Sequence, residues 1–145
     1  MINFELSTLV DRPIEEIFTF ISNPLNTPKW QTMIASIEQV IPGPIGVGTQ
    51  YNVHAALMGR AIDGLLEITS YEPPTKFGFT NKAGPMQVAV TVTLKPVGTG
   101  AKITLNAEGN PGGLFKRAEG PLTHQIKSQM QSNLEKLKSV LEAMV

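Results

Sequence analysis

The sequence contains no cysteine. Its absence excludes disulfide bonds, thiolate metal sites and cysteine nucleophiles, and it is typical of proteins from a reducing compartment. An excess of charge is also missing, because 12 basic residues balance 12 acidic ones. A chain without net charge has no overall field to attract nucleic acid or an anionic membrane surface. We therefore expect a cytoplasmic protein without a nucleic-acid partner.

Long hydrophobic runs are missing as well. No stretch of about 18 uncharged apolar residues occurs, as a membrane-spanning helix would need. Residues 1–13 lack the basic start and continuous apolar segment of a signal peptide. The length of 145 residues is typical of one domain with one core. We predict a single domain over residues 1–145, with no integral membrane association.

Apolar and polar residues alternate over much of the chain, which is the pattern of half-buried β-strands. Clusters of glycine and proline, such as residues 42–48, separate the alternating segments. The pattern predicts an α+β fold with a curved antiparallel sheet of about seven strands. The expected strands are residues 2–10, 34–41, 49–58, 61–71, 77–81, 86–95 and 101–108.

Helical periodicity appears in two places. After the first strand, Asp11 is a candidate N-cap, Pro13 suits a first helical position, and apolar residues follow at helical spacing to Ile21. A further helical turn is expected near Trp30. After residue 113 the pattern is helical to the end, and Gly120-Pro121 should kink or restart this long amphipathic helix, leaving residues 114–119 as a separate short segment. This C-terminal helix is the only expected element long enough to cover the apolar face of the sheet.

The predicted inward face of the sheet mixes large and small side chains. Strongly twisted sheets curl, and small inward residues leave room beneath a covering helix. Small-molecule pockets are mostly apolar, and Tyr51 is the inward polar group best suited to orient a ligand oxygen. A filled core would show the same alternation, so this alternative stays open. The predicted ligand-binding residues are Tyr51, Val53, Leu66, Phe77, Phe79, Met86, Val88, Leu122, Ile126 and Met130.

Three local motifs carry a resemblance to a known family. The first is DRPIEEIF at residues 11–18, followed by Asn23-Pro24 and Pro28-Lys29-Trp30. The second combines GVGTQY at residues 46–51 with ITSYEPP at residues 68–74, and the third is LEKLK in the last helix. With the order of elements, these motifs resemble the START-like (SRPBCC) superfamily, and within it the polyketide cyclase/dehydratase and lipid-transport group.

The resemblance implies a helix-grip fold, in which the sheet wraps around the C-terminal helix and encloses a cavity. It further implies an apolar or amphipathic ligand, such as a lipid or a polyketide. Members of this superfamily include carriers, cyclases and dehydratases, so the resemblance implies no particular reaction. Fold analogy alone is weak evidence for function.

Acid–base or metal chemistry has few candidate residues. Strand parity places His54, Asp63 and Glu67 on the outer face, and helical spacing points His124 away from the apolar stripe. The two histidines have no metal-ligand spacing, so we predict no metal. The glycines at 43, 46 and 48 match no nucleotide-binding fingerprint, so we predict no cofactor.

Three functions remain in competition at this point. The first is a protein that binds a small apolar or amphipathic ligand in an internal cavity, with Arg60 or Arg117 available to an anionic group at its mouth. The second is a cyclase or dehydratase that uses the same cavity. The third is an interaction module of the stress or toxin-antitoxin type that forms a homodimer through its sheet.

Overall fold

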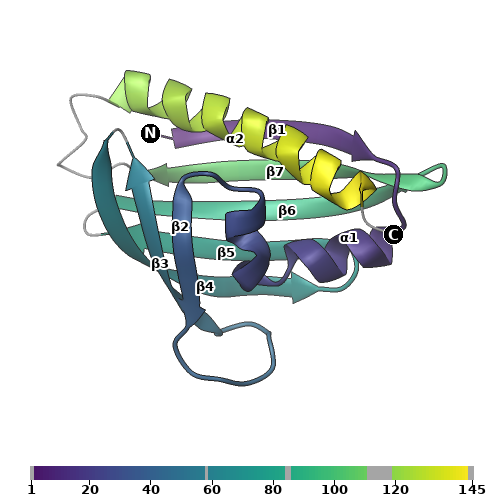
Figure 1. Cartoon of the computed structure of the whole chain (residues 1–145), viewed down its shortest axis with the longest axis horizontal. Coiled ribbons are helices and arrows are strands. Elements are labelled where there is room, and N and C mark those ends of the chain that lie inside the picture. Colours follow the sequence, from purple (N-terminus) through teal and green to yellow (C-terminus); the bar gives the residue numbers. More distant parts are fainter. Residues whose placement is uncertain (1, 58, 84–85, 111–118, 144–145) are drawn as a thin grey trace.

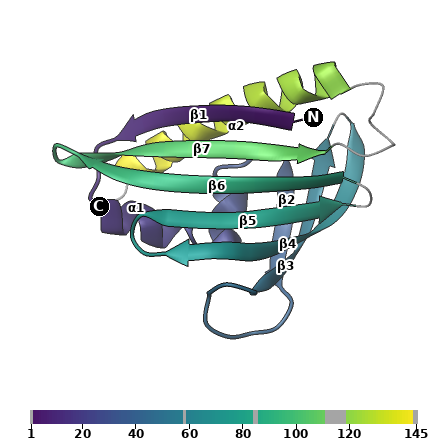
Figure 2. The same ribbon diagram turned by 180° about the vertical axis from the view of Figure 1, so that it is seen from behind.

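The computed structural model describes residues 2–57, 59–83, 86–110 and 119–143. Its strands form one antiparallel sheet in the order β1-β7-β6-β5-β4-β3-β2. Figures 1 and 2 show that the helices lie on one side of this curved sheet and leave its other side uncovered. The predicted α+β architecture is confirmed. The strands are β1 (Ile2–Val10), β2 (Ile34–Gln39), β3 (Gln50–Leu57), β4 (Arg60–Glu72), β5 (Lys76–Ala83), β6 (Met86–Val97) and β7 (Gly100–Asn110).

Strands β2 to β7 follow one another as a meander, whereas β1 pairs with β7 and so joins distant parts of the chain. The hairpin between β6 and β7 turns at Gly98, whose φ of 59° is favourable for glycine. The sequence placed every strand, although β2 ends at Gln39, earlier than expected. Residues 40–48 then form a largely exposed connection to β3. Its Ile41 and Val47 are the most exposed large apolar side chains of the described residues.

Period-two alternation decides which side chains are buried. On β7, Ile103, Leu105 and Ala107 are buried, while Lys102 and Glu108 are exposed. The remaining strands behave similarly, because each pleat sends successive side chains to opposite faces. The inner face therefore forms one wall of the core, and the helices supply the other.

Helix α1 (Ile14–Ile21) and the short 3-10 helix η1 (Pro24–Lys29) follow β1. The expectation that Asp11 caps α1 is wrong, because the N-cap position is Pro13 and has no side-chain cap. The Asp11 carboxylate instead accepts a hydrogen bond from the Thr99 hydroxyl at 2.9 Å. Asp11 lies two residues before the N-cap Pro13, so its carboxylate lies too early in the chain to reach the first amides of the helix.

Helix α2 (Glu119–Glu142) crosses the concave face of the sheet (Figure 1). It buries Met130, Leu134, Leu137 and Leu141 against the core, as the amphipathic pattern predicted. Gly120-Pro121, where a kink or restart was expected, lies in the first turn of α2, which begins at Glu119, and residues 111–118 before it lie outside the described part of the chain. A proline in the first helical turn removes no intrahelical hydrogen bond, so it is tolerated there.

Hydrogen bonds fix the C-terminal end of α2 to the segment between β1 and α1. The backbone amide of Asp11 donates to the Glu142 carboxylate at 3.0 Å, and the Arg12 guanidinium donates to the Leu141 carbonyl at 2.9 Å. The second contact satisfies one of the terminal carbonyls that every helix leaves unpaired. Together these contacts hold α2 in place across the sheet.

Candidate functional site

A cavity of about 140 Å³ lies between the inner face of the sheet and α2. Its walls come from strands β1 to β7, from the η1 region and from the N-terminal half of α2. Small residues on the sheet side, Ala55, Gly64, Ala83 and Ala107, leave this volume unfilled. The interior is therefore not packed solid, and the filled-core alternative does not describe this part of it.

The structure brings most of the predicted ligand-binding residues together around this cavity. Phe77 lines a separate space of only about 10 Å³, and Tyr51 lines neither space. The side chain of Leu122 lies outside the described residues. That any of these residues contacts a ligand stays a prediction. Those lining the larger cavity are Val53, Leu66, Phe79, Met86, Val88, Ile126 and Met130.

Tyr51 packs in the core with no exposed surface, and its hydroxyl has no hydrogen-bond partner among the described residues. Burial, and secondarily the nearby Tyr71, raises the pKa of the Tyr51 phenol. Both effects favour the neutral form. The phenol therefore stays protonated at neutral pH and does not act as an acid or a base toward a molecule in the cavity.

Three polar residues in the lining were missed by the sequence analysis. Thr27 and Gln31 come from η1 and the turn after it, and both are buried. Asn81 comes from β5, where it shares the inward parity of Phe77 and Phe79. Parity could have identified Asn81, but the turn-rich sequence around residues 26–31 gave no signal for the other two.

The remaining lining residues of the described chain are apolar, and none carries an acid, a base or a charge. General acid–base catalysis needs a titrating group within hydrogen-bonding reach of the substrate. This cavity, as described, offers binding surface and amide or hydroxyl contacts. It supplies no side chain that exchanges a proton near neutral pH.

One end of the cavity is formed by four half-buried apolar side chains, Met33, Ile62, Met86 and Ile126. They come from the turn before β2, from β4, from β6 and from α2. The adjoining inward residues Ala55 and Ala83, which pair with Ile62 and Met86, also line the cavity and are only half-buried, so the cavity reaches the surface at this end. Methionine side chains adapt their shape readily, which suits an entrance.

A hydrogen-bond network positions α2 over the cavity. Buried Asn133 accepts from the Thr32 backbone amide at 3.4 Å and from the Gln129 amide at 3.2 Å. Gln129 also donates to the Thr32 hydroxyl at 2.5 Å. These contacts connect the segment after η1 to the helix next to Met130. The spacing between the two walls of the cavity is thereby held by polar contacts as well as by packing.

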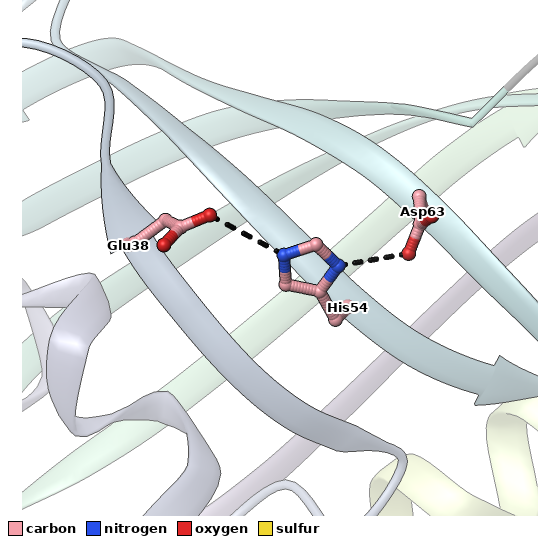
Figure 3. A network of polar contacts seen from close by, with 3 residues as sticks. All are labelled: Glu38, His54 and Asp63. Atoms are coloured by element: carbon pink, nitrogen blue, oxygen red, sulfur yellow. Dashed lines mark hydrogen bonds and ion pairs between the residues drawn. The ribbon is translucent and has the colours of Figure 1, made fainter.

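The histidine that the sequence analysis singled out lies on the opposite face of the sheet (Figure 3). His54 on β3 lies between Asp63 on β4 and Glu38 on β2, with Nδ1 2.9 Å from Asp63 and Nε2 3.4 Å from Glu38. Only the protonated ring can donate both hydrogen bonds at once. The pKa of His54 is therefore raised, chiefly by Asp63 and then by Glu38.

We expect His54 to stabilise the fold at acidic pH and to lose this effect as the pH rises. Its folded pKa lies above the ordinary value of 6.5, so the contribution is complete below that value and disappears through the raised folded pKa. In His54→Gln, the loss of unfolding free energy should accordingly vanish toward alkaline pH. NMR titration should give a lower His54 pKa in Asp63→Asn than in Glu38→Gln. A native pKa at or below 6.5 would contradict the network.

The other polar candidates lie outside the cavity. Asp63 and Arg60 are exposed, Glu67 accepts from the Gln50 amide at 2.9 Å on the outer face, and His124 is exposed on α2. Arg117 is outside the described residues.

Within the described ranges, no group of three or more His, Cys, Asp or Glu residues is arranged to hold a metal ion. The helices in that same part of the chain include none long and apolar enough to cross a membrane.

The curved sheet, the long helix across it and the apolar cavity between them together define a helix-grip protein. Residues 1–142 match the family described as polyketide cyclase / dehydrase and lipid transport, and the chain belongs to this family. The resemblance noted from the sequence motifs is thus confirmed. No curated protein gives a significant match to the chain.

Solved structures with the same fold span nearly the whole chain. Ara h 8.0201 is 21% identical, with a TM-score of 0.74 over 98% of each chain. CV1439 from Chromobacterium violaceum is 18% identical, with a TM-score of 0.75 over 99% of each chain. TTHA0849 from Thermus thermophilus is 20% identical, with a TM-score of 0.73 over 97% of this chain and 94% of the other. At these identities the likeness shows the fold alone.

Proposed function

We propose that this protein binds a compact apolar molecule in the cavity beneath α2 and does so without chemical change. The single observation that carries the proposal is the unfilled volume of about 140 Å³ in an otherwise packed interior. Empty apolar space costs stability, because its lining loses dispersion contacts and burial. A ligand that occupies the space restores those contacts. The family, with its lipid-transport members, supports a ligand of this class.

The size of the cavity limits what it can enclose. An engineered apolar cavity of about 150 Å³ takes up benzene, whereas sites for drug-sized ligands span about 300–1,000 Å³. The volume here therefore fits one substituted ring or an equivalent branched group. A longer lipid or polyketide would have to extend through the end formed by Met33 and Met86. We propose that the enclosed part of the ligand is a single compact apolar group.

Binding is favoured over the two competing functions. A cyclase or dehydratase would need a proton-transferring group at the ligand, and the described lining contains none. A purely dimerising module would have no use for an unfilled interior. We further propose that residues 1–145 act as one domain in the cytoplasm. A chain without cysteine needs no disulfide bonds, which a reducing compartment does not maintain.

A titration with p-xylene, followed by NMR of methyl-labelled protein, tests the proposal. We expect saturable shifts of the Val53, Val88 and Met130 methyl groups, which line the cavity. The exposed methyl groups of Val97 serve as the internal control. Burial of a ring of this size predicts a Kd of about 0.1–1 mM. Shifts that fail to saturate, or that are equally large at Val97, would remove the proposed function.

A further inference from the structure

One polar atom in the cavity wall has no partner. The Asn81 side-chain oxygen Oδ1 is buried, and no described residue donates a hydrogen bond to it. Asn81 lines the cavity among apolar side chains that include Phe79 and Val88. Buried polar groups are nearly always hydrogen-bonded, and leaving one unpaired is costly. Oδ1 has almost no accessible surface and lies against Gly64, so a ligand in the cavity can pair with it once the amide rotates.

The fold makes room for this amide at a specific place. Gly64 on β4 has no side chain, and a Cβ at that position would lie 2.7 Å from Asn81 Oδ1 and 3.0 Å from the Lys82 carbonyl oxygen. Any larger residue at 64 would thus push the amide away. Gly64 itself lines the cavity beside Asn81. The pair forms a polar position within a wall of aliphatic and aromatic groups.

We propose that Asn81 selects ligands that carry a hydroxyl group on a compact apolar body, a specificity that rests on the proposed binding function. The amide offers an acceptor in Oδ1 and a donor in Nδ2, and rotation of the amide exchanges their positions. A hydroxyl donates and accepts, so it pairs with either end. Thr27 and Gln31, the two other polar residues of the lining, supply no charge. An alcohol or a phenol therefore suits this cavity better than a carboxylate.

A matched pair of ligands tests this proposal. p-Cresol and p-xylene have nearly the same shape and differ by a hydroxyl in place of a methyl group. A hydrogen bond with Asn81 should improve the affinity for p-cresol relative to p-xylene by about 5- to 10-fold. We expect the ratio of the two Kd values to change by that factor in Asn81→Leu, which keeps the size of the side chain but removes its polar atoms.

The matched control is Asn52→Leu. Asn52 is exposed on the outer face of β3, so the same substitution there should leave the ratio unchanged. Asn81→Ala, which adds no atoms to the cavity, should also abolish the preference and serves as the second variant if Asn81→Leu does not fold. Affinities for both ligands are measured by NMR titration under identical conditions.

Thermal unfolding of the empty protein gives an independent readout. Because Asn81→Leu removes an unpaired buried acceptor, its unfolding midpoint should rise by about 3 to 6 °C. A residue kept for structural reasons would lower the midpoint when replaced. An unchanged ratio with both ligands bound would overturn the role of Asn81 and leave the binding function intact. Failure of the native protein to bind either ligand would overturn both.

Discussion

Replacing Ala107 with phenylalanine is expected to weaken p-xylene binding by about 100-fold or more while the protein stays folded. Ala107 is only 2% exposed and lines the cavity from β7, between its register partners Phe4 and Val90. A benzyl group at this position extends into the empty volume and takes the place of the ligand. The loss corresponds to about 3 kcal/mol of apolar burial. NMR titration under the conditions used for the native protein measures it.

The neighbouring strand offers a matched control for this substitution. Ala89 on β6 has the opposite parity and is exposed on the outer face. Ala89→Phe adds the same ring outside the cavity, so the affinity for p-xylene should not change. Overpacking typically costs about 1–3 kcal/mol, and urea unfolding detects such a loss in Ala107→Phe. Undiminished binding to a folded Ala107→Phe protein would show that the ligand lies elsewhere.

Replacing Leu134 with alanine should lower the free energy of unfolding by about 2–5 kcal/mol. Leu134 has no exposed surface and lies on the face of α2 that packs against the core. Truncation removes its burial and leaves an additional cavity in the packed half of the molecule. Small domains have only about 5–15 kcal/mol of stability in total, so this is a large fraction. Urea denaturation monitored by far-UV circular dichroism measures the change.

The adjacent residue provides the comparison. Glu135 is exposed on the same helix turn, and Glu135→Ala should change the stability by no more than about 0.5 kcal/mol. Similar effects of the two substitutions would mean that α2 does not bury its apolar stripe against the sheet. A small effect at Leu134 alone would mean that neighbouring side chains collapse into the space.

The architecture could be predicted because its signals are local. Alternation on strands such as β6 and β7 determines both the strand and its buried face, and the apolar spacing of Met130 and Leu134 determines the covering face of α2. Ends of elements were less well determined. The apolar residues Val40 and Ile41 extend the strand pattern in the sequence, but β2 ends before them and both are exposed.

The cavity itself could be predicted only in outline. Inward parity identifies Val53 and Tyr51 equally, yet only Val53 borders the unfilled volume. The difference depends on where the helices pack, which alternation does not encode. Asn81 shows that the same limit holds for a polar residue of the cavity wall. Its parity is inward, but only the three-dimensional structure shows that its oxygen has no partner and that Gly64 makes room for it.

The pairing of β1 with β7 has a consequence for how the chain folds during synthesis. Strands β3 to β6 pair with their neighbours in sequence, so their hairpins can close as soon as each has left the ribosome. Strand β1 is made first but has no partner until β7 has emerged. Its apolar residues Phe4 and Leu6, which are buried in the folded protein, meanwhile stay exposed. Chaperones bind such exposed apolar side chains in nascent chains.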